Sequence, residues 1–189
     1  MSRPMRADAR RNVAAILDAA TDCLGRDPDV SVADIAAAAR VGRITLYGHF
    51  KTRAELVDAV LSRTLAHADE ILAATRSSED PSADLAALVT AAWRIVHQHR
   101  NVLLAAQREL PAERIRGTHD HVLRRVQTVL RRGRRTGEFR TDLPVQWLVT
   151  TTFSLMHAAA EDVAAGRLKA DDAARYITRT LLAAFAPPS

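Results

Sequence analysis

Apolar residues recur along this chain at intervals of three and four positions, and this spacing constrains the fold more than any other feature of the sequence. Such spacing gathers side chains on one face of an α-helix, whereas a half-buried strand would alternate at every second residue. The sequence has no alternating β-branched run of strand length, and only seven glycines and seven prolines interrupt its 189 residues. We therefore expect an all-α protein with room for one ordinary domain, or for a small and a medium one.

Glycine, proline and capping residues divide the periodic pattern into separate helices. Ser31 with Asp34, and Thr52 with Glu55, have the spacing of capping boxes, and Pro81 follows the clearest linker. The predicted helices cover about residues 9–24, 31–39, 43–49, 52–75, 81–96, 112–135, 144–165 and 170–185, with a short segment around residues 102–104.

Arginine supplies almost all of the positive charge: the chain has 27 basic and 22 acidic residues, and only Lys51 and Lys169 are lysines. The planar fork of arginine suits phosphate groups and guanine edges, so nucleic acid is the first partner to consider. A net charge of +5 is nevertheless too small to establish nucleic-acid binding from composition alone. By segment, the net charge is +3, −4, +7 and −1 over residues 1–53, 54–99, 100–140 and 141–189.

Several classes of protein are excluded by what the sequence lacks. The single cysteine, Cys23, excludes an internal disulfide framework and an all-cysteine zinc site, and it fits a reducing compartment. No apolar run approaches the roughly 18–20 residues that span a bilayer, and the charged start is not followed by the hydrophobic core of a signal peptide. We expect a cytoplasmic protein with no membrane association.

Residues 31–53 hold two short predicted helices joined by a tight turn, which is the pattern of a helix-turn-helix. In that motif the second helix enters the major groove of DNA while the first crosses the backbone. The apolar residues that would join the two helices are Ile35, Ala36, Ala39, Val41, Leu46 and Phe50. Six side chains are candidates for DNA contact, three on the second helix and three around the start of the next, whose amides favour phosphate. They are Arg43, Thr45, Tyr47, His49, Lys51 and Arg53.

The segment Thr45-Leu46-Tyr47-Gly48-His49-Phe50-Lys51-Thr52-Arg53-Ala54-Glu55-Leu56 resembles the T-L-Y-x-H-F-x-[ST]-[KR]-x-x-L signature of TetR-family transcriptional regulators. The resemblance covers about residues 9–60. It implies a homodimer whose two N-terminal domains bind double-stranded DNA at a palindromic operator. It also implies a helical C-terminal domain that dimerises and often holds a small-molecule effector. We therefore expect a DNA-binding domain over residues 1–53 and a ligand-binding and dimerisation domain over residues 54–189.

The chain departs from the family pattern at three positions. Arg40 stands where the family usually has the glycine of the turn, so we expect a left-handed backbone conformation that such a residue rarely adopts. Gly42 replaces a frequent serine and still suits the start of a helix. Gly48 stands where many relatives carry an aromatic or basic contact residue, which puts more weight on Arg43, Thr45 and Tyr47.

The last two predicted helices are candidates for the dimer seam, because paired helices from two subunits would form a four-helix bundle. The expected seam residues are Leu148, Thr152, Leu155, Ala159, Ile177, Leu181 and Ala184. A second set of side chains is expected to line an effector pocket, with histidines as its polar groups. This set is Trp93, His97, Phe153, Met156 and His157, each of which is equally a plain core residue at helical spacing.

Some basic and aromatic residues have two readings. Tyr47 and His49 either contact DNA or brace neighbouring helices, and we expect DNA contact for both. The N-terminal arginines form either a minor-groove arm or a disordered basic tail; they are Arg3, Arg6, Arg10 and Arg11. The central arginines form either a solvated helix face, as we expect, or a contact surface for DNA or an acidic partner; they are Arg124, Arg125, Arg131, Arg132 and Arg135.

An enzyme is the main rival class, and the sequence offers little for it. His97 with His99, and His119 with His121, are two positions apart, which on a helix points each pair to different faces. No nucleophile elbow, phosphate loop or paired-carboxylate arrangement is present. We therefore expect no enzyme, no cofactor and no metal site. A closer rival is a ligand-independent or architectural DNA-binding protein.

Overall fold

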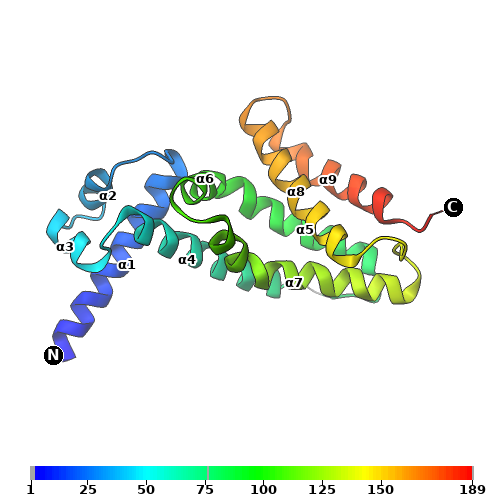
Figure 1. Ribbon diagram of the computed structural model, residues 1–189, viewed down its shortest axis with the longest axis horizontal. Coiled ribbons are helices and arrows are strands. Elements are labelled where there is room, and N and C mark those ends of the chain that lie inside the picture. The colour runs from blue at the N-terminus through cyan, green and yellow to red at the C-terminus, as the bar shows by residue number, and fades with distance from the viewer. Residues whose placement is uncertain (1–2, 76, 189) are drawn as a thin grey trace. The chain divides into compact units, whose positions relative to one another are not determined.

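The computed structural model describes residues 3–75 and 77–188, and the side chains from residue 10 onward within them. Over these residues the chain forms nine α-helices and no strand, which confirms the all-α prediction (Figure 1). In chain order they are α1 (Arg3–Arg26), α2 (Val32–Ala38), α3 (Arg43–His49), α4 (Arg53–Ala73), α5 (Pro81–Gln98), α6 (Arg100–Glu109), α7 (Ala112–Thr136), α8 (Val145–Ala164) and α9 (Ala170–Phe185).

The helix ends follow the capping residues that the sequence indicated. The Ser31 hydroxyl accepts the Asp34 N–H at 3.1 Å, and the Thr52 hydroxyl accepts the Glu55 N–H at 3.1 Å. The Glu55 carboxylate accepts the Lys51 N–H at 2.6 Å, so α4 begins with reciprocal capping. At the other end of a helix, α7 stops at Gly137, whose φ of 83° suits glycine.

Two helices extend beyond their predicted bounds. The helix α1 begins at Arg3 instead of about residue 9, with Pro4 in the first turn, where its missing N–H leaves no helical bond unmade. The short segment expected around residues 102–104 is the ten-residue helix α6. Its apolar side chains Val102, Ala105 and Ala106 follow helical spacing and are buried.

The chain forms two compact units, and each is described by itself. The N-terminal unit comprises Met1–Thr64 and His99–Thr118, and the C-terminal unit comprises Leu65–Gln98 and His119–Ser189. The boundaries of these compact units therefore differ from the domain boundary expected between residues 53 and 54. The reason is that α6 packs on α1 and so belongs to the N-terminal unit. The Asn101 amide, for example, donates to the Gly25 carbonyl at 2.8 Å. The functional boundary stays a prediction.

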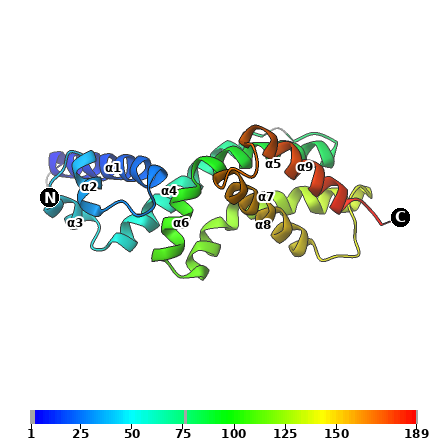
Figure 2. The ribbon, with the colours of Figure 1, turned by 90° about the horizontal axis from the view of Figure 1, so that it is seen from above.

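In the N-terminal unit, α1 packs against α2, and α2 packs against α3 (Figure 2). Ile16, Ala20 and Leu24 are fully buried at helical spacing on α1. They belong to the same unit as the buried Ile35 of α2 and Leu46 of α3. The unit thus holds α3 through one face while the rest of that short helix projects outward.

In the C-terminal unit, α5 and α8 each pack against α9 around a single apolar core. The core includes Leu85 of α5, Leu148 of α8, and Leu181 and Phe185 of α9. Phe139, in the turn after α7, packs its ring directly against Gly133 of that helix. No helix in the described residues is long and apolar enough to cross a membrane.

The arginine-rich face of α7 is less uniformly solvated than expected. Arg124, Arg131 and Arg135 are exposed, as expected for a solvent-exposed helix face. Arg125, however, pairs with Asp69 of α4 at 2.7 Å, and Arg132 pairs with the buried Asp84 of α5. Two of the five central arginines therefore join α7 to its neighbours within the C-terminal unit, which corrects the reading of a purely solvated face.

Candidate nucleic-acid interface and ligand pocket

The turn between α2 and α3 contains the backbone conformation expected for Arg40, whose φ is +55°. The Arg40 N–H donates to the Ala37 carbonyl and the Val41 N–H donates to the Ala36 carbonyl, both at 3.0 Å. This pair of bonds closes the C-terminus of α2 and redirects the chain into α3, the arrangement in which glycine is the usual residue. The backbone at Arg40 is therefore strained, and this conformation sets the direction of α3.

The helix α3 is held to its unit by Leu46 and by Phe50 directly after it, both of which are buried. Arg43, Thr45 and Tyr47 are exposed on the same helix, as their assignment to DNA contact requires. Ile44 of the same helix is the most exposed of the large hydrophobic residues described, at 91%, and it was not among the predicted contact residues. Ile44 lies one turn before Tyr47, on the outward face of the helix predicted to read DNA, and this spacing could have indicated its exposure.

The three basic candidates around the start of α4 have different environments. Lys51 is exposed, and His49 is half-buried on a groove that it lines with Arg10 of α1 and Arg63 of α4. His49 therefore has basic neighbours from two other helices, which favours contact with a phosphate group over a purely bracing role.

Arg53 is held within the N-terminal unit by three contacts that the sequence did not reveal. Its Nη2 donates to the Pro28 carbonyl at 2.8 Å, its Nη1 donates to the Val30 carbonyl, and its Nε donates to Glu109 at 3.0 Å. The guanidinium thus joins the loop before α2, the start of α4 and the end of α6. We assign Arg53 to holding the unit together, and its contact with DNA stays an untested prediction.

The N-terminal arginines are only partly described. Arg10 and Arg11 lie in α1, so their backbone is helical where a disordered tail was one of the two readings. The side chains of Arg3 and Arg6 lie outside the described residues.

The C-terminal unit contains a partly open apolar pocket. Of the five predicted pocket residues, Phe153, Met156 and His157 line it. Trp93 and His97 do not, which corrects that part of the prediction. Trp93 is buried in the core, where its indole N–H donates to the Ala170 carbonyl at 3.2 Å and its ring stacks on the exposed His97 at 5.5 Å.

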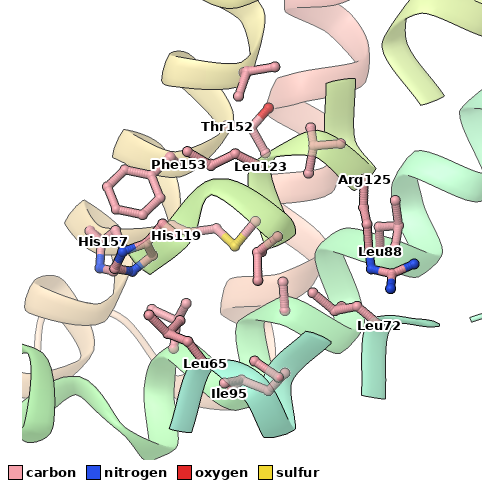
Figure 3. A pocket seen from close by; sticks show the side chains of 17 residues that line it. Leu65, Leu72, Leu88, Ile95, His119, Leu123, Arg125, Thr152, Phe153 and His157 are labelled. Carbon is pink, nitrogen blue, oxygen red and sulfur yellow. The ribbon is translucent and has the colours of Figure 1, made fainter. Parts of the chain in front are cut away.

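His119 also lines the pocket, although the sequence suggested it only as a poorly spaced metal ligand beside His121. It lies three and seven positions before Val122 and Val126, on the apolar stripe of α7, and that spacing predicts an inward side chain. Figure 3 shows the imidazoles of His119 and His157 gathered with Phe153 on one side of the pocket. The His119 ring centroid lies 5.2 Å from Phe153 and 6.5 Å from His157.

The pocket has little polar character despite its two histidines. Burial, with the nearby His119 as a second cause, lowers the pKa of His157 to about 4, so its imidazole is neutral at pH 7. The Thr152 hydroxyl donates to the Leu148 carbonyl within its own helix at 2.9 Å. Arg125 lines the opposite side and is paired with Asp69, and the lining residues include no carboxylate. The arrangement suits an apolar ligand whose polar end is neutral or anionic.

The residues predicted for the dimer seam mostly face the interior of the C-terminal unit. Leu148, Thr152, Ala159, Ile177 and Leu181 are buried, Leu155 is partly buried against the same core, and Ala184 is exposed. A side chain already covered by its own chain supplies no contact to a second copy, which corrects the prediction for the five buried residues. The large exposed side chains of α8 and α9 are instead Trp147, at 59%, and Tyr176, at 45%.

Comparisons with known proteins bear on both parts of the chain. Residues 16–60, which span the last eleven residues of α1, all of α2 and α3 and the start of α4, match the model of the bacterial regulatory proteins of the tetR family. Among the curated proteins, none matches the chain. Several solved structures share the fold of almost the whole chain at low sequence identity.

A TetR family transcription regulator from Marinobacter aquaeolei VT8 is 17% identical with a TM-score of 0.71, over 97% of this chain and 98% of that one. The fatty acid degradation regulator FadR from Bacillus halodurans is 19% identical with a TM-score of 0.76, over 90% and 94% of the two chains. FadR from Bacillus subtilis, in complex with stearoyl-CoA, is 17% identical with a TM-score of 0.75, over 89% and 97%. The chain thus has the fold of these regulators, and its helix-turn-helix segment, residues 16–60, matches the tetR family of bacterial regulatory proteins.

Proposed function

We propose that this protein is a sequence-specific, dimeric repressor that binds a palindromic operator and leaves it when a small apolar molecule fills the pocket of the C-terminal unit. The observation that carries the proposal is the outward face of α3. Leu46 anchors that helix, while Arg43, Thr45 and Tyr47 are exposed beside it. Side chains of this kind on a helix that fits the major groove read base edges through hydrogen bonds and apolar contact.

Phosphate contact is assigned to His49 at the end of α3 and to basic residues outside that helix. His49, Arg10 and Arg63 line one groove, and Lys51 is exposed next to the start of α4. Contacts of this type fix the position of a protein on the duplex without reading its sequence. They supplement the base contacts of α3, and they make binding weaker as the salt concentration rises.

A homodimer follows from the palindromic site, because twofold symmetry presents two copies of α3 about 34–36 Å apart, or one turn of duplex. We assign the seam to the outer faces of α8 and α9, where Trp147 and Tyr176 are exposed. Large aromatic side chains are enriched in the contacts that dominate protein interfaces.

The proposed effector is a small, mostly apolar molecule with a neutral or anionic end. The pocket walls are apolar, and His119, Arg125 and His157 are their only ionisable groups among the lining residues. The similar regulator from Bacillus subtilis is in complex with stearoyl-CoA, an apolar chain on an anionic carrier. The helix α4 begins at Arg53 and supplies Leu65, Ala68 and Leu72 to the pocket, so a shift of α4 on ligand binding would reach the DNA-binding domain.

Selection of duplexes from a random pool with the wild-type protein tests this function. A repressor recovers one palindromic sequence, which it binds by orders of magnitude more tightly than a scrambled duplex at the same salt concentration. An architectural protein binds all duplexes with similar affinity and a steep salt dependence. Equal affinity for the selected and scrambled duplexes would therefore overturn the proposal and favour the architectural alternative.

A further inference from the structure

The outward face of α3 carries a feature that charge does not explain. Ile44, Tyr47 and Gly48 lie at positions i, i+3 and i+4, and therefore share one side of the helix. Ile44 is 91% exposed and Tyr47 is 44% exposed. Gly48, which follows them on this side of the helix, has no side chain. The result is an apolar surface with a notch at its C-terminal end.

The fold of the N-terminal unit does not require glycine at position 48. Gly48 is absent from the described residues with positive φ, and a Cβ placed on it would meet no atom within 4 Å. Glycine in a helix interior is nevertheless less stable than alanine, because it loses more conformational freedom on folding. A close approach of a partner to the backbone is the remaining physical use of a glycine at such a place.

Other glycines of the chain show how Gly48 differs. Gly133 is covered by the Phe139 ring, and Gly137 and Gly166 have positive φ, so each of these three has a reason within the fold. Gly117 of α7 has the same open space as Gly48. Its surroundings are polar, however, since Arg114 lies one turn before it and pairs with Asp58. Open space alone therefore does not mark a site, and the apolar neighbours of Gly48 supply the second observation.

The apolar group that the major groove offers is the C5 methyl of thymine. An isoleucine side chain has no hydrogen-bonding group, so within that groove it distinguishes bases only through this methyl. Exposing nearly all of Ile44 to water is unfavourable in the free protein, and contact with a methyl group removes part of that exposed surface. Gly48, one turn further along, leaves the helix backbone free to lie close to the base edges.

We propose that Ile44 reads a thymine methyl and that Gly48 permits the close approach this contact needs. The inference rests on the proposed function, since it assigns specificity within the same DNA-reading helix. It makes the two residues specificity-determining for this chain, in addition to the polar side chains Arg43, Thr45 and Tyr47.

The first experiment isolates the methyl group. The probe is the duplex selected by the wild-type protein, with each thymine replaced in turn by deoxyuridine, which lacks only the C5 methyl. We expect one symmetry-related pair of replacements to weaken wild-type binding by about fourfold per half-site. This is the change in affinity expected when one buried methyl-sized group is removed. Ile44→Ala should bind the thymine and deoxyuridine probes equally. A deoxyuridine effect that is equally large in Ile44→Ala overturns the Ile44 assignment.

The second experiment tests the notch with a matched pair of helical glycines. Gly48→Ala and Gly117→Ala should both raise the melting temperature, because both add a methyl group in open space. Only Gly48→Ala should lose affinity for the selected duplex, by at least about tenfold, since a misplaced reading helix affects both half-sites. Wild-type affinity in Gly48→Ala overturns this part of the inference.

The two proposals fail in different ways. If the wild-type protein selects no preferred duplex, the proposed function and this inference fall together. If it selects one, and the deoxyuridine and glycine comparisons show no difference, only the inference falls.

Discussion

Arg40 is the single non-glycine residue with positive φ among the described residues, and it stands where the chain turns from α2 into α3. A left-handed backbone is unfavourable for any residue with a Cβ atom, by roughly 1–2 kcal/mol. The chain keeps an exposed arginine there although glycine would fit the conformation without strain.

We predict that Arg40→Gly increases the free energy of unfolding by about 0.5–1 kcal/mol, because relief of strain exceeds the added freedom of the unfolded chain. The neighbouring Ala39 has φ −73°, so Ala39→Gly should decrease stability by a similar amount. Urea unfolding of both variants measures the two effects. A loss of stability in Arg40→Gly would mean that its backbone is not strained.

Asp84 is a buried carboxylate, and burial alone would raise its pKa. Hydrogen bonds from Arg132 and from Ser78 and Ser77 outweigh burial and lower the pKa of Asp84 to about 2, from an ordinary value of 3.8. A carboxyl group whose pKa is lowered by folding stabilises the protein above its unfolded-state pKa. That contribution is lost as the pH falls from about 4 to about 2.

We therefore predict that wild-type protein loses about 2 kcal/mol of stability through Asp84 between pH 4 and pH 2, following from the shift of nearly two units. Asp84→Asn removes this part of the pH dependence, whereas Glu79→Gln, at an exposed neighbouring position, retains it. Urea unfolding across this pH range provides the comparison. Parallel curves for wild type and Asp84→Asn would contradict the assignment.

At the scale of elements, the C-terminal end of α7 depends on one close contact. A Cβ atom on Gly133 would overlap the ring of Phe139, which is buried in the core of the C-terminal unit. The chain turns directly after this contact, where the Glu138 and Phe139 N–H groups both donate to the Gly133 carbonyl, at 2.9 and 3.1 Å. The helix end and the turn are thus packed as one piece.

We predict that Gly133→Ala lowers stability by about 1–3 kcal/mol, because the added methyl displaces a buried ring. Gly117→Ala on the same helix should instead raise it, since the methyl enters open space. Thermal unfolding of the pair distinguishes packing from helix propensity. If both alanines stabilise the protein, the Gly133–Phe139 contact is not tight.

Helix positions were predictable wherever the chain caps its own helices. Ser31 and Thr52 fixed the starts of α2 and α4, because their hydroxyls satisfy free backbone donors. The extent of α6 was missed because its N-cap residue, His99, makes no side-chain capping bond. Local capping chemistry thus marks the starts of α2 and α4, whereas the start of α6 carries no such mark.

The candidate sites were predictable to different degrees. The exposure of Arg43, Thr45 and Tyr47 on α3 follows from the turn and two buried anchors, whereas Ile44 on the same helix was missed. Trp93 was misplaced because helical spacing shows that a side chain points inward, and not whether it meets packed atoms or a cavity. Leu148 and Ile177 were misplaced because spacing does not distinguish a contact within the chain from a contact with a second copy.

The proposed binding to a palindromic operator requires two copies of the chain. Trp147 and Tyr176 are the large apolar side chains left exposed on α8 and α9. Because the five buried residues of these helices are already covered, we assign the proposed dimer contact to these exposed aromatics.

We predict that Trp147→Glu and Tyr176→Glu shift the protein toward the monomer at micromolar concentration, because each would bury a charge in the seam. Ile71→Glu changes a similarly exposed apolar side chain on α4 and should leave the dimer intact. Light scattering after size exclusion measures the mass. A wild-type monomer at this concentration would remove the dimer from the account.

The proposed function requires that α3 reads DNA sequence. Its most direct test is the affinity of Arg43→Ala and Tyr47→Ala for the duplex selected by the wild-type protein, with Arg131→Ala, an exposed arginine of α7, as the control for lost charge. We predict that each α3 variant loses at least about tenfold in affinity for the selected duplex, while its weak binding to a scrambled duplex changes little. Wild-type affinity in both α3 variants would contradict the claim.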